Sequence, residues 1–191
     1  MNLPNRITTA RLALSVVLFV LLETVCRHAY DGFWWYAAFV LYIVTVVTDG
    51  LDGYYARSRN QITSFGRIVD PLADKIVICG VLVLCSTIPQ TKALVPPWIV
   101  LVVLAREFLV SGLRGFLEGQ GAGFPARWEG KAKLWLQAWY CGGAIFFPGN
   151  HWAWCEFVTI FFLWATFAIT VYSAYAYVRS AARMITAGKG L

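Results

Sequence analysis

One stretch of the chain decides the fold, and it runs Asp49-Gly50-Leu51-Asp52-Gly53-Tyr54-Tyr55-Ala56-Arg57. The 17 residues before it, Gly32–Thr48, carry no charge. A helix needs about 20 mostly apolar residues to cross the hydrocarbon of a bilayer. The apolar run therefore reaches full length only if the helix continues through Asp49 and Asp52, which gives an expected span of 33–55. The sequence thus places two carboxylates at or just inside a membrane boundary.

A second apolar run has the same feature at its other end. The 16 residues Ile76–Thr91 are uncharged. This run reaches full length only if its helix starts near residue 67 and includes Asp70 and Asp74, which gives an expected span of 67–89. Pro71 is then expected in the first helical turn, where a proline is tolerated. Two further carboxylates fall at the same membrane boundary.

Apolar runs of this kind recur along the whole chain. Hydrophobic residues make up 59% of the 191 residues and charged residues 14%, whereas an ordinary globular domain has about 45–50% apolar and about 25% charged residues. This composition excludes a disordered chain and a simple soluble fold. We expect an all-α integral membrane protein with six transmembrane helices in a single domain, 1–191. A short interfacial segment, 1–6, precedes spans at approximately 7–26, 33–55, 67–89, 94–117, 132–150 and 155–178.

The basic residues predict the orientation of these spans. With six spans, both chain ends lie on one side, and that side holds 14 of the 16 Lys and Arg residues. Only Arg27 and Lys92 fall on the other side, so the termini are expected to be cytoplasmic. The aromatic clusters Phe33–Tyr36 and Trp152–Trp154 lie at the opposite interface, as an aromatic belt does. The net charge of +6 therefore reports orientation and gives no support to nucleic-acid binding.

The four aspartates are spaced to converge on one point. Asp49 and Asp52 lie three residues apart on one helix and Asp70 and Asp74 four apart on the next, so each pair shares a helix face. If these helices are antiparallel neighbours, four carboxylates meet in a low-dielectric groove and repel unless divalent cations neutralise them. Oxygen-only ligation selects Mg²⁺ or Mn²⁺. The pattern predicts a metal site at the cytoplasmic ends of helices 2 and 3; the simpler alternative is that the acids cap helix ends and pair with nearby basic residues.

Residues around these acids fit phosphoryl transfer. Gly53 lets a ligand approach the backbone closely, and Arg57, one turn beyond, is placed to pair with a phosphate. Two metal ions stabilise the attacking and leaving oxygens in such reactions. The five cysteines form no C-x-x-C pair, which argues against a zinc site.

A group of cations forms a second candidate region. Arg106 and Arg114 lie eight residues apart within the span 94–117, so they share a broad helix face. A buried arginine in a span is costly and usually meets a partner or an anion. Lys131 and Lys133 add two cations at the start of the next span. Together these residues are expected to bind a second phosphate. The alternative for Arg106 is a structural pair with Glu107 or Glu118, and the alternative for the other three is that they mark the cytoplasmic side.

The acidic stretch resembles a known family. The pattern D-x2-D-G-x2-A-R-x8-G-x3-D-x3-D is similar to the signature of the CDP-alcohol phosphotransferases, integral membrane enzymes with six helices. Its fixed positions here are Asp49, Asp52, Gly53, Ala56, Arg57, Gly66, Asp70 and Asp74. The resemblance implies that the four aspartates bind two divalent metal ions and that Asp70 and Asp74 are catalytic, with Asp74 as base. It also implies that Asp52, Gly53, Ala56, Arg57 and Gly66 hold the CDP-lipid.

Within that family, the chain resembles the bacterial phosphatidylglycerophosphate synthases. The shared stretches are R-E-x3-S-x-L-R from Arg106, W-x-G-K-x-K from Trp128, and an opening N-x2-T-x2-R at Asn5, Thr8 and Arg11. This resemblance implies CDP-diacylglycerol as donor, glycerol 3-phosphate as acceptor and phosphatidylglycerol phosphate as product. It assigns Asn5, Thr8 and Arg11 to the CDP-lipid, and the acceptor phosphate to Arg106, Arg114, Lys131 and Lys133. A homodimer in the bacterial inner membrane is also implied.

Two kinds of alternative stay open. The acceptor alcohol of the reaction differs between relatives, so an enzyme of the cardiolipin synthase, phosphatidylinositol phosphate synthase or phosphatidylserine synthase type fits the acidic pattern too. A neutral acceptor leaves the cations without a purpose, which favours a phosphorylated one. The second alternative is a divalent-cation channel or transporter lined by the acids, but these acids collect at one boundary with no matching cluster at the other.

Overall fold

The computed structural model describes residues 3–28, 32–58, 64–119 and 128–188, and these residues form helices and no strand. Helix α1 (Leu3–Val20) continues into a π-helix, η1 (Leu21–Cys26), and is followed by α2 (Gly32–Ser58) and α3 (Ser64–Thr87). Helices α4 (Pro97–Gly119), α5 (Trp128–Asn150) and α6 (Ala153–Gly188) complete the bundle. The all-α class expected from the apolar runs is confirmed for the described chain.

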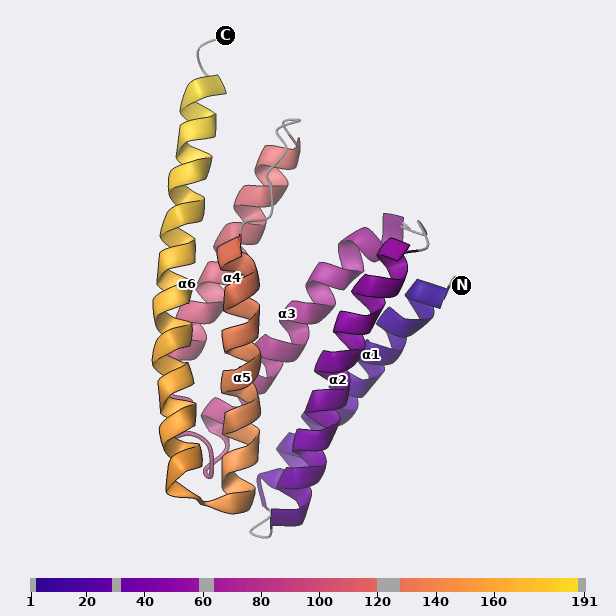
Figure 1. The fold of residues 1–191 in the computed structure, drawn as a ribbon, viewed down its shortest axis with the longest axis vertical. Helices are drawn as coiled ribbons and strands as arrows, with labels where there is room; N and C mark the ends of the chain where they lie inside the picture. The colour runs from indigo at the N-terminus through magenta and orange to yellow at the C-terminus, as the bar shows by residue number, and fades with distance from the viewer. Residues whose placement is uncertain (1–2, 29–31, 59–63, 120–127, 189–191) are drawn as a thin grey trace.

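The helices run alternately up and down, and both chain ends lie toward the same end of the bundle (Figure 1). Helix α5 packs against α6 and α2, while α1 packs against both α2 and α3. Helix α4 packs against α6 and α3. A core of buried apolar side chains, including Leu18, Trp35, Leu82 and Ile145, joins these helices.

Close approach of the helices depends on two glycines. A Cβ built at Gly80 of α3 would stand 2.2 Å from the ring of Phe19 in α1, and one at Gly143 of α5 would stand 2.6 Å from the hydroxyl of Thr159 in α6. Real Cβ contacts do not occur at such distances, so any side chain at either position forces its neighbour to move. These glycines fix the separations α1–α3 and α5–α6.

Several helix boundaries differ by a few residues from the expected spans, and the differences in α3 and α6 have a clear physical context. Helix α3 begins at Ser64 rather than near residue 67, so Pro71 lies in the second helical turn and not in the first. Because proline has no backbone N–H, Pro71 removes one hydrogen bond from a helix that continues past it. Helix α6 continues ten residues beyond the expected end of its span, because the residues from Arg179 to Gly188 are compatible with a helix that has left the hydrocarbon.

The turn between α5 and α6 is tight. Helix α5 continues through Pro148 to Asn150. His151 then adopts a left-handed conformation with φ of 53°, and its N–H donates to the carbonyl of Phe147 at 2.9 Å. This is the hydrogen bond with which a left-handed residue closes a helix. It sends α6 back antiparallel to α5.

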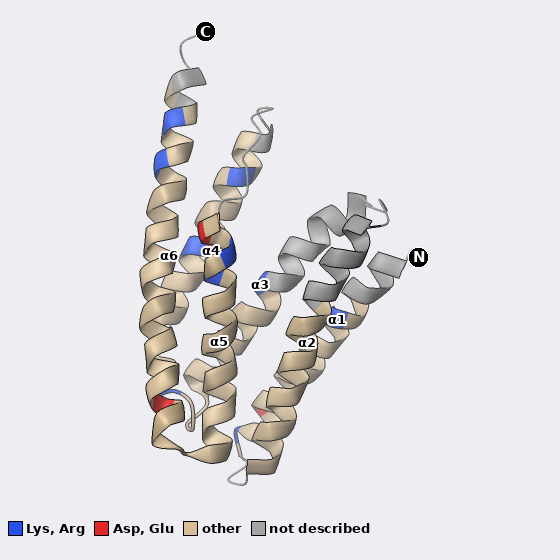
Figure 2. Ribbon diagram, in the orientation of Figure 1, with Lys and Arg blue, Asp and Glu red and all other residues tan. Residues whose placement is uncertain are grey.

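Charge is segregated along the bundle. Among the described residues, Lys and Arg are more frequent toward the end of the bundle that holds both chain ends (Figure 2), whereas Arg27, just after η1, and Lys92, between α3 and α4, lie in connections at the other end. Large apolar side chains cover much of the outer surface, among them Phe108, Trp135 and Phe157, which are 75%, 70% and 72% exposed. By length and hydropathy, Thr9–Cys26 and Ala153–Met184 are candidate membrane spans, and Gly32–Thr48 and Lys75–Thr87 are shorter apolar helices. An apolar exterior of this extent fits a lipid surround.

Candidate active site

The four predicted metal ligands lie on the two helices expected to carry them. Asp49 and Asp52 are in α2 and Asp70 and Asp74 are in α3. Their side chains are outside the described part of the structure. The same holds for the side chains predicted to bind the CDP-lipid in these helices and at the start of α1: Asn5, Thr8, Ala56 and Arg57, together with the glycine positions Gly53 and Gly66.

A small cavity lies about one helical turn along the chain from Asp49 and from Asp74. Its volume is about 80 Å³, and it is lined by residues of four helices: Arg11 from α1, Thr45 and Val46 from α2, Val77 and Ile78 from α3, and Leu134 and Ala138 from α5. Thr45 comes four residues before Asp49, and Ile78 comes four residues after Asp74, which is about one turn of each helix. Helices α2 and α3 therefore both line this cavity close to the turns that carry Asp49 and Asp74.

Arg11 is the one predicted CDP-lipid residue whose side chain is described. It lines the cavity and is only 2% exposed. A buried guanidinium in an apolar helix is costly, and such groups are found where they face charged partners or a polar cavity. The position of Arg11 therefore agrees with a role beside the carboxylate-bearing turns.

Two of the predicted acceptor-site cations meet on one acid. Glu107 Oε1 accepts a hydrogen bond from Lys133 Nζ of α5 and another, at 3.2 Å, from Arg106 Nη1. Arg106, Glu107 and Lys133 are 6%, 7% and 2% exposed. These two cations share one carboxylate, so the trio carries one excess positive charge. A buried group of this kind is suited to receive an anion.

Helix α6 supports this group with residues that the sequence analysis did not select. Arg106 Nε donates to Ser173 Oγ at 3.1 Å, and the guanidinium carbon lies 5.4 Å from the centroid of the Tyr177 ring. Ser173 follows Thr166 and Thr170 at helical spacing within an otherwise apolar run. The spacing of these three hydroxyl residues in the sequence indicates that α6 turns a polar face toward its neighbours.

A further contact ties α3 to the same turn of α4. Lys75 Nζ donates to Ser111 Oγ, and the Ser111 hydroxyl donates in turn to the main-chain carbonyl of Glu107 at 2.6 Å. Lys75 directly follows Asp74 in the chain. The helix that carries two of the aspartates is therefore linked through Lys75 and Ser111 to the cationic group.

The other two predicted cations are placed differently. Arg114 lies two turns beyond Arg106 on α4 and is partly buried, and its Nε has no hydrogen-bond partner among the described residues. Lys131 is exposed at the start of α5. Neither side chain joins the Glu107 group through a contact within the described part of the chain. The structure thus brings together Arg106 and Lys133 and leaves Arg114 and Lys131 at the margin.

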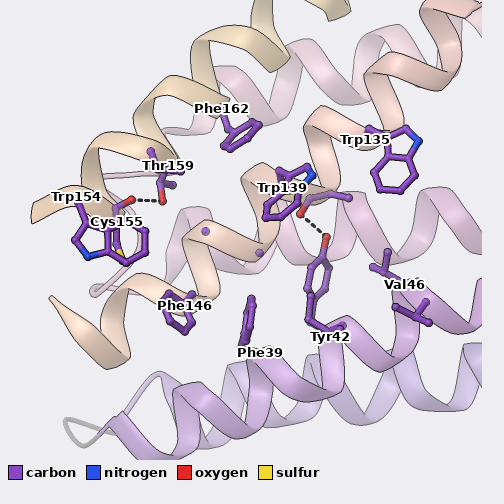
Figure 3. A pocket seen from close by; sticks show the side chains of 16 residues that line it. Phe39, Tyr42, Val46, Trp135, Trp139, Phe146, Trp154, Cys155, Thr159 and Phe162 are labelled. Atoms are coloured by element: carbon purple, nitrogen blue, oxygen red, sulfur yellow. Dashed lines mark hydrogen bonds between the residues drawn. The ribbon is translucent and has the colours of Figure 1, made fainter. Parts of the chain in front are cut away.

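An apolar groove opens beside the cavity, between α2, α5 and α6. It has a volume of about 390 Å³. Figure 3 shows Phe39 and Tyr42 on one wall and Trp139 and Phe162 on the other, with the Trp139 and Phe162 rings stacked at 5.9 Å between centroids. The Tyr42 hydroxyl donates a hydrogen bond to the main-chain carbonyl of Ala138 at 2.8 Å. The surface that remains is almost wholly apolar.

The groove and the cavity share part of their walls. Val46 and Ala138 line both. Val47, which also lines the groove, comes two residues before Asp49, so the groove begins about 3 Å of helix rise from the first acid. The apolar groove thus begins just before the turn of α2 that carries Asp49.

Comparison with known proteins gives the family of the chain. A family model described as CDP-alcohol phosphatidyltransferase matches residues 1–172. The chain belongs to this family. A curated relative from Bacillus subtilis, named CDP-diacylglycerol--glycerol-3-phosphate 3-phosphatidyltransferase, is 37% identical over 150 residues, which cover 71% of this chain and 72% of the relative. A relative of the same name from Rickettsia bellii is 32% identical over 184 residues and covers 94% of each chain, and one from Haemophilus influenzae is 31% identical over 144 residues, 74% of this chain and 75% of its own.

Family membership confirms the resemblance drawn from the acidic pattern. It makes the protein a transferase of phospholipid biosynthesis, and together with the apolar helices it makes it a membrane protein. The region that matches the family model ends at residue 172, within α6. The last turns of that helix therefore lie beyond the family model.

Proposed function

We propose that the protein transfers the phosphatidyl group of CDP-diacylglycerol to glycerol 3-phosphate, giving phosphatidylglycerol phosphate and CMP. One observation carries the choice of acceptor: Arg106 and Lys133 are buried on a single carboxylate, Glu107. This group has a surplus of positive charge and lies next to the helix that bears Asp74. An acceptor with a doubly charged phosphate uses that surplus, whereas a neutral alcohol does not. The names of the curated relatives support the same reaction.

In the proposed step, a hydroxyl oxygen of glycerol 3-phosphate attacks the lipid-side phosphorus of the diphosphate. Asp74 takes the hydroxyl proton, the bond between that phosphorus and the bridging oxygen breaks, and CMP leaves with the bond's electrons. Asp49, Asp52, Asp70 and Asp74 would hold two divalent cations, Mg²⁺ or Mn²⁺, because oxygen-only donors at helical spacing suit hard ions. Bound there, the ions would neutralise the diphosphate and the charge that develops during transfer.

The remaining polar residues are assigned to the parts of the two substrates that do not react. We assign the CMP moiety to residues of α1, α2 and α3, namely Asn5, Thr8, Arg11, Asp52, Gly53, Ala56, Arg57 and Gly66. The acceptor phosphate is assigned to Arg106 and Lys133 at the base of the site and to Arg114 and Lys131 at its margin. The apolar groove beside Val46 and Ala138 is assigned to an acyl chain of the donor, since it begins next to the carboxylates and offers almost no polar surface.

The membrane arrangement forms part of the proposal. Six helices would span the bilayer, with both termini and the active site on the cytoplasmic side of a bacterial inner membrane. The concentration of described cations toward one end supports this orientation. The exposed Trp34, Trp152 and Trp154 at the opposite end fit an interfacial belt. A homodimer, as implied by the family resemblance, is proposed on that ground alone.

An acceptor screen tests the function. Purified protein is incubated with CDP-diacylglycerol, Mg²⁺ or Mn²⁺ and one alcohol at a time: glycerol 3-phosphate, phosphatidylglycerol, inositol phosphate or serine. We expect CMP release with glycerol 3-phosphate and a phosphatidylglycerol phosphate product. Turnover with another acceptor alone would replace this function by one of the other synthase types, and metal-dependent ion flux without CMP release would point to a channel.

Replacing Arg114 by Ala is expected to raise the KM for glycerol 3-phosphate about tenfold and to change kcat little. Arg114 has a buried Nε without a partner among the described residues, so it is free to donate to the acceptor phosphate, and one such charged hydrogen bond is worth about 1.5–3 kcal/mol. Steady-state kinetics with glycerol 3-phosphate varied would measure the effect. An unchanged KM removes Arg114 from the acceptor site.

Replacing Ala138 by Phe is expected to narrow the groove at its end nearest the carboxylates. For a donor with long acyl chains, kcat/KM should fall about tenfold, whereas a short-chain donor should be affected much less, because overpacking costs about 1–3 kcal/mol only where the chain must lie. Val171→Phe, on the lipid-facing surface of α6, is the matched control. Equal losses for both donors would place the acyl chain elsewhere.

A further inference from the structure

Glu107 occupies an unusual position for an acid next to an anion site. Its Oε1 accepts from both Lys133 and Arg106, and it is 7% exposed. A carboxylate in this place repels a phosphate, so electrostatics alone predicts that it weakens acceptor binding. Its presence therefore requires a compensating contribution.

The two cations depend on Glu107 to different degrees. Arg106 has further support from α6, through Ser173 Oγ at 3.1 Å and the face of Tyr177. For Lys133, which is 2% exposed, Glu107 is the one polar partner among the described residues. A lysine side chain has four rotatable carbons and no fixed donor geometry. The place of the Lys133 ammonium is therefore set by Glu107.

Glu107 also begins the turn that reaches α3. Its main-chain carbonyl accepts a hydrogen bond from Ser111 Oγ, and Ser111 Oγ in turn accepts one from Lys75 Nζ of α3. The single turn 107–111 of α4 thus carries contacts to α3 through Lys75, to α5 through Lys133 and, by way of Arg106, to α6.

We propose that Glu107 is a positioning residue, which holds the Lys133 ammonium and one edge of the Arg106 guanidinium in place for the acceptor phosphate. This proposal rests on the proposed function. Glu107 does not touch the substrate in this account; it acts through the two cations. The competing explanation is a buried ion pair that serves stability only, for which loss of one partner destabilises the fold without a selective effect on the acceptor.

The two explanations, and simple charge repulsion, predict different kinetics for Glu107→Gln. If Glu107 positions the cations, its loss raises the KM for glycerol 3-phosphate about tenfold even though the site has become more positive. If repulsion dominates, the same KM falls. If the pair is only structural, the thermal unfolding temperature falls and the KM stays the same. The KM for CDP-diacylglycerol is expected to stay within about twofold in every case, since the donor residues lie on other helices.

The experiment compares Glu107→Gln and Glu107→Asp with the wild-type enzyme in the same detergent or nanodisc. Asp keeps the charge but withdraws the carboxylate by about one C–C bond, and it is expected to raise the KM for glycerol 3-phosphate by less than Gln does. The matched control is Glu23→Gln, which removes a 2.7 Å ion pair with Arg27 at the opposite end of the bundle and should leave both KM values unchanged. Protection against thermal unfolding by glycerol 3-phosphate without donor provides a readout of binding that needs no turnover.

The outcomes separate this inference from the function. If the wild-type enzyme gives no turnover with glycerol 3-phosphate, the proposed function fails and the inference fails with it. If the wild-type enzyme turns over but the KM of Glu107→Gln is unchanged or lower, the inference alone is overturned. If Gln does not fold, the Asp variant decides in the same way, and failure of both to fold assigns Glu107 to stability and overturns the positioning role.

Discussion

Asp70→Asn is expected to abolish CMP release from CDP-diacylglycerol while the protein remains folded. Asn keeps the size and one acceptor oxygen but loses the negative charge that a divalent cation requires. Asp70 lies in α3, one turn from Asp74, so in the proposed site its loss removes one metal ligand and changes the charge around the proposed base. A fall in kcat of at least about 10³-fold is expected for a group that acts in the transition state.

Two measurements make this result specific. Mg²⁺ or Mn²⁺ should raise the thermal unfolding temperature of the wild-type protein and should do so less, or not at all, for Asp70→Asn. Glu156→Gln, an exposed acid in the first turn of α6 at the opposite end of the bundle, should retain both activity and metal-induced stabilisation. Turnover of purified Asp70→Asn at the wild-type rate would remove this residue from the metal site.

Lys133→Met is expected to raise the KM for glycerol 3-phosphate about 10- to 100-fold. Met has a similar length and can fill the buried space, but it removes a charged donor worth about 1.5–3 kcal/mol to a phosphate. It also leaves Glu107 paired only with Arg106, so the surplus positive charge of the group is lost. Varying each substrate separately should show that the KM for CDP-diacylglycerol changes little.

Lys92→Met is the control for this substitution, because Lys92 lies between the end of α3 and the start of α4, at the opposite end of α3 from Asp70 and Asp74. It should leave the kinetics of both substrates unchanged. A Lys133→Met enzyme with the wild-type KM for glycerol 3-phosphate would contradict the assignment of the acceptor phosphate to the Glu107 group.

The helical class and the helix that bears each acid were predictable because both follow from local pattern. Uncharged runs too short to span a bilayer had to extend through Asp49 and Asp52 on one side and Asp70 and Asp74 on the other, and α2 and α3 do include them. The span of α3 was expected to start near residue 67, and the helix begins three residues earlier, at Ser64. A proline is best tolerated in a first helical turn, which favoured the later start, but a helix tolerates one missing hydrogen bond when its packing continues.

The bridging role of Glu107 could not be predicted from the sequence. Its neighbour Arg106 was visible as a partner, but Lys133 lies 26 residues further along the chain. Their contact depends on how α4 and α5 are placed around α6. The apolar groove depends likewise on three helices whose separation is set by contacts such as Gly143 against Thr159. Local periodicity reports which face of a helix is polar, and it does not report which helix that face will meet.

The wall shared by the groove and the small cavity has a kinetic consequence. Val46 and Ala138 stand between the apolar groove and the small cavity, whose walls include Thr45, one turn before Asp49. In the proposed reaction, the lipid donor reaches the diphosphate site sideways from the bilayer, while the water-soluble acceptor arrives from the aqueous side. Neither substrate blocks the entrance of the other, so both can be bound at once. The geometry favours direct transfer within a ternary complex over a ping-pong cycle with a phosphatidyl-enzyme intermediate.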